Sequence, residues 1–435
     1  MGGDAVSETE MLQAVATTDV DPQALDLSQP GVAEMALFSP MAPRVRANPY
    51  PIYHRLRATD PVHLSPFGTA LLTRYDDAVA VLRDKRFSVQ HRDFVDERGP
   101  ETSIIESFGP TPRERDMSNV MLFIDPPRHT RLRTLVNKAF TPRVVERLRD
   151  RIEAILDELL DEVEDKGEMD VISALAYPLP VQVICEMLGV PSDDRQRIRG
   201  WSRKIAPILD PFVTAEGEAG IEDAESHLQP YWDGLIEDRR ADLRDDLLSE
   251  LIRAEDEGHR LNHEELRSTC NLLLIAGHET TMNLIGNGLL ALLRHPDQVE
   301  KLHAHPELAR NAVEELLRFD SPVHLTARTA TEDVEVGGVT LPRGHLAIVA
   351  LGGVNRDPAH FGDPDRVDIE RNPNPHLAFS AGAHFCVGAG LARLEAQLAF
   401  TRLLERVPKL ELADPDPEYR ETVTLRGLKA LPVVF

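Results

Sequence analysis

The sequence predicts a mainly α-helical domain with small β-sheets, a fold of the α+β class. Two long stretches have helical periodicity, Arg143–Glu164 and His263–Arg294. The second stretch is apolar on nearly all sides, which is typical of a helix at the centre of a large protein. After Phe319 the pattern changes to short alternating segments, and Gly337-Gly338 is expected to form a hairpin turn between two of them.

The other expected elements follow from the same patterns. We expect a shorter amphipathic helix at Pro306–Phe319, a last helix from Cys386 through Leu404, and strands at 327–330, 334–341, 346–349, 422–425 and 430–434. Residues 355–375 are rich in Pro, Asp and Asn and have no periodicity, so an irregular segment is expected there. Residues 1–37 are interpreted as a polar N-terminal tail, which leaves 38–435 as a single domain.

Composition and charge exclude several classes of function. The formal net charge of the 435 residues is −25, so the molecule as a whole repels nucleic acid and anionic membranes. The three cysteines are too few and too scattered for a disulfide framework, which favours a reducing, cytoplasmic setting. No apolar run approaches the roughly 18 residues of a spanning helix, and the N-terminus lacks the pattern of a signal peptide. We therefore expect no membrane anchor and, by default, a monomer.

The segment Phe379-Ser-Ala-Gly-Ala-His-Phe-Cys-Val-Gly388 carries the strongest chemical signal. A buried cysteine is usually an inert apolar side chain, and we interpret the other two cysteines in this way. Cys386 differs because Gly382 and Gly388 allow the backbone to approach a flat ligand. A helix that begins at Gly388 points free N–H groups at the sulfur, which favours the thiolate, the form that binds metals. Phe379 can shield that sulfur from water.

A second motif, Ala276-Gly-His-Glu-Thr-Thr281, lies midway along the expected central helix. A structural interpretation is a helix kink in which the threonine hydroxyls donate to carbonyls four residues earlier. The functional interpretation is that Gly277 opens a groove for dioxygen, while Glu279 and Thr280 deliver protons during its activation. A zinc site of the His-Glu-x-x-His type is disfavoured because Met282 stands where the second histidine would be.

Two further segments place charged side chains on one helix face. His129 and Arg133 lie four residues apart in a segment that starts with Asp125 as the N-cap, and a solvated basic face is the default interpretation. Glu315 and Arg318 lie one helical turn apart, a spacing that is common in weak surface ion pairs. Taken alone, neither segment indicates a function.

In their order along the chain, these segments resemble the cytochrome P-450 family. The cysteine segment is similar at every defined position to the family's heme signature, Phe-x-x-Gly-x-His-x-Cys-x-Gly, although Ser380 stands where the family commonly has Gly. The central-helix motif is similar to the oxygen-activation motif Ala/Gly-Gly-x-Asp/Glu-Thr-Thr, and His129-Thr-Arg-Leu-Arg133 to the family's His-Thr-Arg-x-Arg. The resemblance covers about residues 38–435 and implies a single-domain cytochrome P-450 fold, with heme between the long central helix and the cysteine loop.

The resemblance implies a bacterial-type heme-thiolate monooxygenase with heme b (iron protoporphyrin IX) as its cofactor. Such an enzyme inserts one oxygen atom from O2 into a hydrophobic small molecule, by C–H hydroxylation or epoxidation. Electrons come from an external ferredoxin and its NAD(P)H-dependent ferredoxin reductase. The resemblance assigns the iron ligand to Cys386, the proton relay to Glu279 and Thr280, and a structural ion-pair triad to Glu315, Arg318 and Arg366. It places further residues around the heme, namely His129, Arg133, Arg328 and His384 at the propionates, with Phe379, Gly382, Gly388, Ala276 and Gly277.

Position relative to these motifs indicates further sites. The candidate substrate-pocket residues are Leu272, Ile275, His324, Thr326, Thr424 and Leu425, and a lid is expected at 97–120 and 208–222. A basic docking surface for ferredoxin is expected on the thiolate side, from Arg131, Arg133, Lys138, Arg143 and Arg393. Two alternative functions are a peroxide-driven peroxygenase on the same heme-thiolate and a heme-binding sensor or carrier without turnover. The Glu279–Thr280 pair disfavours both, because neither function needs a proton relay.

Overall fold

Helices form most of the chain in the computed structural model, which describes residues 20–39, 42–66, 68–91, 117–210, 213–254 and 260–435. Its α-helices are α2 (Val32–Phe38), α3 (Pro43–Ala47), α4 (Tyr50–Thr59), α5 (Tyr75–Arg83), α6 (Arg128–Ala139), α7 (Pro142–Glu146), α8 (Arg149–Asp161), α9 (Pro178–Met187), α10 (Arg195–Ile205), α11 (Ala215–Ala241), α12 (Leu247–Arg253), α13 (His263–Leu293), α14 (Pro296–Ala304), α15 (Ala309–Phe319), α16 (Leu351–Val354) and α17 (Ala389–Arg406). Its strands are β1 (Val62–Leu64), β2 (Thr69–Leu72), β3 (Phe87–Ser88), β4 (Glu168–Asp170), β5 (Thr326–Ala330), β6 (Val334–Val336), β7 (Val339–Leu341), β8 (Leu346–Val349), β9 (Glu411–Leu412) and β10 (Pro432–Val434).

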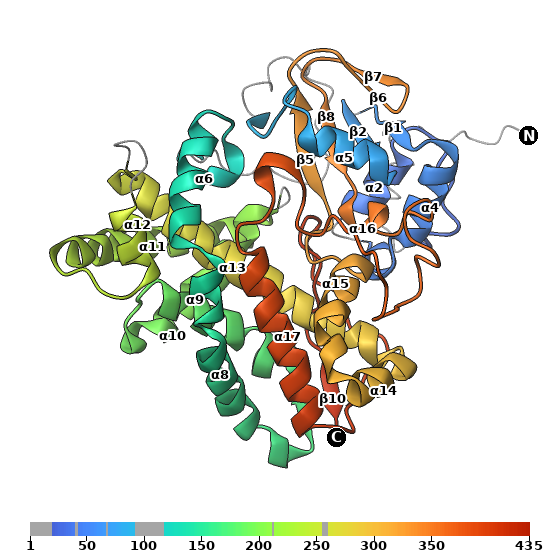
Figure 1. Cartoon of the computed structure of the whole chain (residues 1–435). Helices are drawn as coiled ribbons and strands as arrows, with labels where there is room; N and C mark the ends of the chain where they lie inside the picture. The colour runs from blue at the N-terminus through green and yellow to red at the C-terminus, as the bar shows by residue number, and fades with distance from the viewer. Residues whose placement is uncertain (1–19, 40–41, 67, 92–116, 211–212, 255–259) are drawn as a thin grey trace, which may run out of the picture.

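Most of the long helices and most of the strands occupy different sides of the molecule. Figure 1 shows α6, α8 to α13 and α17 in one helical body, while β1, β2 and β5 to β8 gather with α2, α4, α5 and α16 on the other side. The largest apolar core lies in the helical body, and two smaller cores lie on the sheet side. The prediction of a mainly helical fold with small sheets is confirmed.

Helix α13 is the long central helix that the sequence predicts. Its start is fixed by a capping box, in which the Asn262 side chain accepts from the Glu265 amide and the Glu265 side chain accepts from the Asn262 amide. It spans 31 residues, about 46 Å, and is buried along most of its length. It packs against α9, α11, α15 and α17. Within the described residues, no helix is both long and apolar enough to cross a membrane.

The main sheet has five strands in the order β1-β2-β8-β5-β3. Strands β5 and β8 pair antiparallel, with Arg328 opposite Ala347. The expected hairpin is the β6–β7 pair, and Gly337 and Gly338 turn it with φ of 58° and 85°. The strand expected at 422–425 is wrong, because this stretch forms a turn held by a single bridge between Val323 and Leu425.

The boundary at residue 37 is wrong for the part of the expected N-terminal tail that the structure describes. Residues Val32–Phe38 form α2, and all seven of its side chains are buried. They pack with Leu25, Tyr50 and Tyr53 in one of the smaller cores. The physical reason is the apolar run Val32-Ala-Glu-Met-Ala-Leu-Phe38, whose one acid, Glu34, meets His63 of β1 at 3.2 Å. Residues 1–19 lie outside the described part of the chain.

Candidate active site

Cys386 lies in a short loop between the turn Gly382–His384 and the start of α17. Its amide donates a hydrogen bond to the carbonyl of Phe379 (3.0 Å), which closes the loop. Gly382 has a φ of 72°, and a Cβ there would collide with the carbonyl oxygen of Leu82, so the loop requires glycine at this position. Ser380, where the sequence departs from the P-450 signature, also has a positive φ of 61°.

The surroundings of the Cys386 sulfur combine burial with nearby positive charge. Burial raises the pKa of the Cys386 thiol above its ordinary value, although the amides of Gly388 and Ala389 and the guanidinium groups of Arg133 and Arg393 act in the opposite direction. The two amides belong to the N-terminus of α17, as the sequence predicts. Amides and cations directed at one sulfur are the environment in which a thiolate forms and binds a metal.

Four basic side chains from α6, β5 and the cysteine loop come together: His129, Arg133, Arg328 and His384. The rings of His129 and His384 lie with their centroids 4.1 Å apart. Burial and the three other basic groups lower the pKa of His384 to about 3, and burial lowers the pKa of Arg328 to about 10. Within the described residues, Arg328 donates to the Thr326 hydroxyl (3.2 Å) and a carbonyl (2.7 Å) rather than to a carboxylate. A buried guanidinium such as that of Arg328 fits a ligand that carries anionic groups.

The threonines of the central-helix motif donate back to their own helix. The Thr280 hydroxyl donates to the carbonyl of Ala276 (2.7 Å), and the Thr281 hydroxyl donates to that of Gly277 (3.1 Å). These are the hydrogen bonds that the structural interpretation of the motif expects, although α13 continues through the motif as one helix. A Cβ at Gly277 would contact Ile184 of α9 at 3.5 Å, so this glycine faces α9. The dioxygen groove at Gly277 stays a prediction.

Glu279 is buried, and each of its carboxylate oxygens has a partner. Oε1 lies 3.2 Å from His278 Nε2, and Oε2 accepts a hydrogen bond from Arg420 (2.9 Å). Burial by itself raises the pKa of Glu279, but His278 and Arg420 together hold it below its ordinary value. No sequence motif indicates Arg420, because it lies far along the chain from Glu279 and outside every recognisable motif.

The ion-pair triad has a different third member from the one expected. Arg318 donates to both oxygens of Glu315 (2.7 and 2.8 Å), and both side chains are fully buried. The third partner is Arg371, whose Nε lies 3.1 and 3.2 Å from the two oxygens. The assignment of Arg366 is wrong, since its side chain is 67% exposed and lies 3.7 Å from Asp297. Only the Arg366 carbonyl joins the network, as an acceptor for Arg318 (3.1 Å).

Comparison with known sequences settles the family. The sequence model described as "Cytochrome P450" matches residues 88–426. The chain belongs to the cytochrome P450 family. The prediction made from the motifs is therefore confirmed.

Two P450s with curated sequences illustrate the closeness of the match. The chain is 42% identical over 411 residues to the "Polyketide biosynthesis cytochrome P450 PksS" of Bacillus subtilis (strain 168), which covers 92% of this chain and 99% of that protein. It is 44% identical over 397 residues to the "Cytochrome P450 monooxygenase PikC" of Streptomyces venezuelae, covering 89% and 91%. Both matches extend over nearly the whole chain, so the family's oxidoreductase activity applies to it: the chain is a P450 monooxygenase.

A solved P450 structure gives the same result for the fold. The structure titled P450BioI in complex with hexadec-9Z-enoic acid ligated Acyl Carrier Protein superposes with a TM-score of 0.80 at 38% identity. The superposition covers 90% of this chain and 99% of that one. The prediction of a cytochrome P-450 fold is confirmed.

The side chains of the site fit the heme that P450s bind with its iron. The Cys386 sulfur supplies a donor among helix amides, and the guanidinium groups of Arg133 and Arg328 match the charge of two propionates. Leu272, Ala276 and Thr280 follow one another at four-residue spacing on one face of α13. These three are partly exposed where their neighbours are mostly buried, so this face is open to a ligand.

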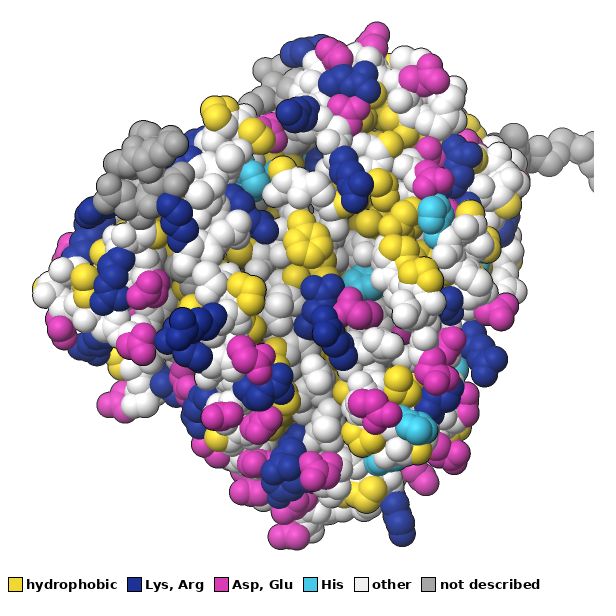
Figure 2. All heavy atoms as spheres, in the orientation of Figure 1, with side chains coloured by type: hydrophobic (Ala, Val, Ile, Leu, Met, Phe, Trp, Pro, Cys, Tyr) yellow, Lys and Arg dark blue, Asp and Glu magenta, His cyan; other side chains and the backbone are white. Residues whose placement is uncertain are grey.

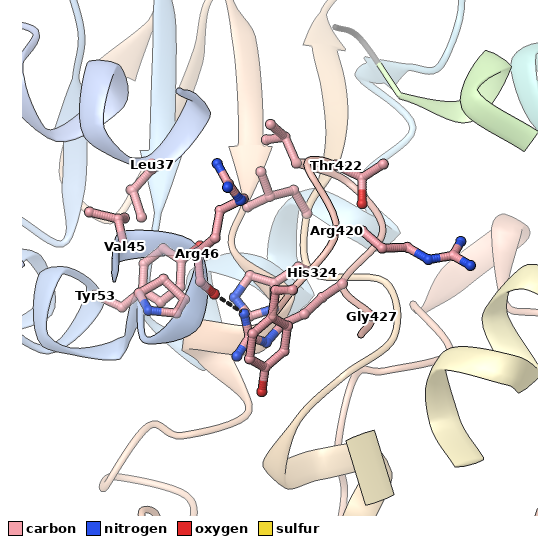
Figure 3. Close-up of a pocket in the computed structure, with 13 residues that line it drawn as sticks. Leu37, Val45, Arg46, Tyr53, His324, Arg420, Thr422 and Gly427 are labelled. Carbon is pink, nitrogen blue, oxygen red and sulfur yellow. Dashed lines mark hydrogen bonds between the residues drawn. The ribbon is translucent and has the colours of Figure 1, made fainter. Parts of the chain in front are cut away.

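The structure separates His324 from the other candidate pocket residues. The His324 ring is buried between Tyr50 and Tyr53 of α4, with centroids 5.8 and 5.6 Å away. It lines the small cavity of Figure 3, whose walls also include Leu37, Val45, Arg46, Tyr53, Thr422 and Gly427. Leu272, Ile275, Thr326, Thr424 and Leu425 do not line this cavity.

The turn at residues 422–425, called the C-terminal turn below, contains two candidate pocket residues, Thr424 and Leu425, and contacts the expected lid. The His324 amide donates to the Thr424 carbonyl (2.8 Å), and Leu425 bridges to Val323. Asp210, in the second lid stretch, accepts from the amides of Val423 (2.7 Å) and Thr424 (2.9 Å). Within that stretch, residues 215–222 are helical, as the start of α11, whereas 97–116 of the first stretch lie outside the described residues.

Proposed function

We propose that this P450 inserts one oxygen atom from O2 into a hydrophobic small molecule, by C–H hydroxylation or epoxidation. We further propose heme b as the cofactor, and an external ferredoxin with an NAD(P)H-dependent reductase as the electron source. The observation that carries the proposal is the convergence of the Cys386 loop with four basic side chains, of which His129 and Arg328 are buried. A thiolate donor and two guanidinium groups, with two histidines beside them, together match both the iron and the propionates of heme b.

Each residue of the site has a proposed task. Bound heme supplies the oxidising chemistry, and a thiolate ligand favours cleavage of the O–O bond. Cys386 binds the iron, while Phe379 keeps water from the sulfur. His129, Arg133, Arg328 and His384 hold the propionates, and Gly382 and Gly388 shape the loop. On α13, Ala276 and Gly277 lie beside the heme, while Glu279 and Thr280 move protons toward it.

The substrate is proposed to be lipophilic. Apolar side chains of α13, Leu272 and Ile275, stand near the face that is open to a ligand, together with Thr326, Thr424 and Leu425 from the sheet side. Two of the similar proteins point the same way, since PksS is named for polyketide biosynthesis and the solved P450BioI structure is titled with a fatty acid on a carrier protein. His324 is less suited to a direct substrate contact, because it is buried against α4.

Ferredoxin is proposed to dock on the face that carries α17. Figure 2 shows Lys and Arg side chains across the middle of this face, while Asp and Glu are frequent toward its lower end. The chain as a whole has a net charge of −25 and would repel an acidic ferredoxin, so the local group of Lys and Arg side chains is needed to attract it. Phe385, next to Cys386, is 43% exposed and offers an apolar contact for a partner. Arg131 is a poor test position, because it pairs with the buried Glu265 of α13.

Charge reversal tests the docking surface. Lys138→Glu and Arg143→Glu are expected to slow reduction of the heme by an acidic ferredoxin and to weaken the dependence of that rate on salt. Rates are measured by stopped-flow absorbance at several ionic strengths. Arg240→Glu, at an exposed position of α11, serves as a control with the same change in charge. Equal rates in all four proteins would contradict docking on this face.

Turnover tests the proposed reaction. Purified protein is titrated with a library of lipophilic compounds, and those that shift the heme spectrum are offered with ferredoxin, reductase and NAD(P)H. The expected result is a product that carries one oxygen atom from 18O2. Product with hydrogen peroxide but none with the redox partners would favour a peroxygenase. Spectral binding without any product would favour a sensor or carrier.

A further inference from the structure

The two partners of Glu279 lead away from it in opposite directions. His278 comes from α13 itself, and Arg420 comes from the C-terminal segment that follows β9. Since Glu279 is 3% exposed, any proton that it delivers has to arrive past one of these two side chains. The surroundings of His278 and of Arg420 indicate which of the two routes a proton takes.

The His278 side is closed. Nδ1 donates to the carbonyl of Leu274 (2.6 Å). Nε2 then lies between the Ser202 hydroxyl of α10 (3.0 Å) and Glu279 (3.2 Å). His278 and Ser202 are both fully buried. The ring of Tyr177 stands edge-on to His278 at 5.7 Å and adds a buried wall.

The Arg420 side is partly open. The Arg420 side chain is 30% exposed, although its guanidinium donates to the buried Glu279 (2.9 Å). A second contact, to the sulfur of Met282 (3.5 Å), keeps the guanidinium against α13. Arg420 also lines the cavity at His324, but in Figure 3 its guanidinium points away from His324.

The backbone around Arg420 is held tightly to the central helix. The Arg420 amide donates to the carbonyl of Gly427 (2.9 Å). A Cβ at Gly427 would collide with the side chain of Asn283 on α13, so this close approach requires glycine. Asn287, one turn further along, donates to the carbonyl of Arg426 (3.0 Å). The base of the C-terminal turn therefore presents Arg420 to Glu279 from a fixed position.

Other charged groups near Glu279 are few among the described residues. On the α9 and α10 side, Tyr177 faces Glu279. The guanidinium groups of Arg199 and Arg203 lie over the Tyr177 ring, 4.9 and 4.8 Å from its centre. Burial raises the pKa of Tyr177, so it stays neutral near pH 7. Arg420 is the cation that touches the carboxylate itself.

We propose that Arg420 is a positioning residue for Glu279, and that protons reach this acid from the side of Arg420 rather than through His278 and Ser202. Its guanidinium keeps Glu279 ionised and turns Oε2 toward the partly exposed C-terminal segment. This inference rests on the proposed role of Glu279 as a proton relay. It assigns a task to a residue that lies outside the motifs of the sequence.

A spectroscopic titration tests the positioning independently of turnover. The carboxyl band of Glu279, defined as the infrared band lost in Glu279→Gln, is followed against pH in the resting protein. Removing the cation in Arg420→Gln is expected to raise the titration midpoint by about one pH unit or more. Arg420→Lys retains the charge and is expected to restore most of the original midpoint. Arg294→Gln removes another arginine between α13 and the C-terminal segment, at Asp416 (3.3 Å), and is expected to change nothing.

The direction of proton entry is tested by the solvent isotope effect on turnover. Arg420→Gln is expected to increase the effect of deuterated water severalfold, whereas Ser202→Ala leaves it at the parent value. The reverse pattern, or an unchanged Glu279 band in Arg420→Gln, would overturn the inference. If Glu279→Gln itself keeps the parent rate and isotope effect, the relay role of Glu279 is wrong. If only Glu279→Gln is impaired, the relay stands and the role of Arg420 fails.

Discussion

Replacing Arg371 with Ala is expected to destabilise the fold by about 3 kcal/mol. The guanidinium lies 3.1 and 3.2 Å from the two oxygens of the fully buried Glu315, and it also donates to the carbonyl of Gly362 (2.7 Å). Loss of one partner of a buried ion pair costs about 3–5 kcal/mol when the other charge is left alone. Glu315 keeps Arg318 and the amide of Asp368, so the lower end of this range applies.

The assay is denaturant unfolding followed by far-ultraviolet circular dichroism, at equal heme occupancy in every variant. Arg366→Ala is the matched control, because its side chain is 67% exposed whereas that of Arg371 is 11% exposed. Arg366→Ala is expected to leave the midpoint unchanged, since exposed pairs contribute little. An equal loss of stability in the two variants, or a larger one in Arg366→Ala, would refute the assignment of Arg371.

Three other variants test separate parts of the structure. Ser380→Gly is expected to stabilise the protein by about 1 kcal/mol, because glycine adopts a φ of 61° without strain; a lower denaturant midpoint would argue against this. Burial lowers the pKa of His63, but hydrogen bonds, first that of Glu34, raise it overall from 6.5 to about 9. The stability that the protonated ring contributes is therefore full below pH 6.5 and is lost as the pH rises through about 9, and His63→Gln is expected to flatten that loss; identical pH profiles would contradict it. Asp210→Ala removes the acceptor for the amides of residues 423–424 and is expected to weaken substrate binding in optical titrations, whereas unchanged affinity would disconnect this turn from the pocket.

The sequence predicts the parts of this molecule whose interactions are local. The loop around Cys386 is an example, because the glycines, the helix start and the cysteine lie within ten residues. The same holds for α13, whose apolar pattern and capping residues, Asn262 and Glu265, are adjacent in the chain. The Glu315–Arg318 pair also follows from helical spacing.

What the sequence does not predict depends on contacts between distant segments. Residues 355–375 lack periodicity, so no pattern indicates that Arg371 turns inward while Arg366 stays exposed. Arg420 is 141 residues from Glu279, and only the packing of the C-terminal turn on α13 brings them together. Helix α2 was missed because seven residues are too few for a helical pattern to stand out from a polar terminus.

The carbon monoxide spectrum of the reduced protein tests the central claim, that Cys386 is the thiolate ligand of the heme iron. The parent protein is expected to show the red-shifted band of a thiolate-bound heme, and Cys386→His is expected to lose that band while it still binds heme. Cys185→Ala and Cys270→Ala, which change the two fully buried cysteines, are expected to keep it. A red-shifted band that survives in Cys386→His would contradict the claim.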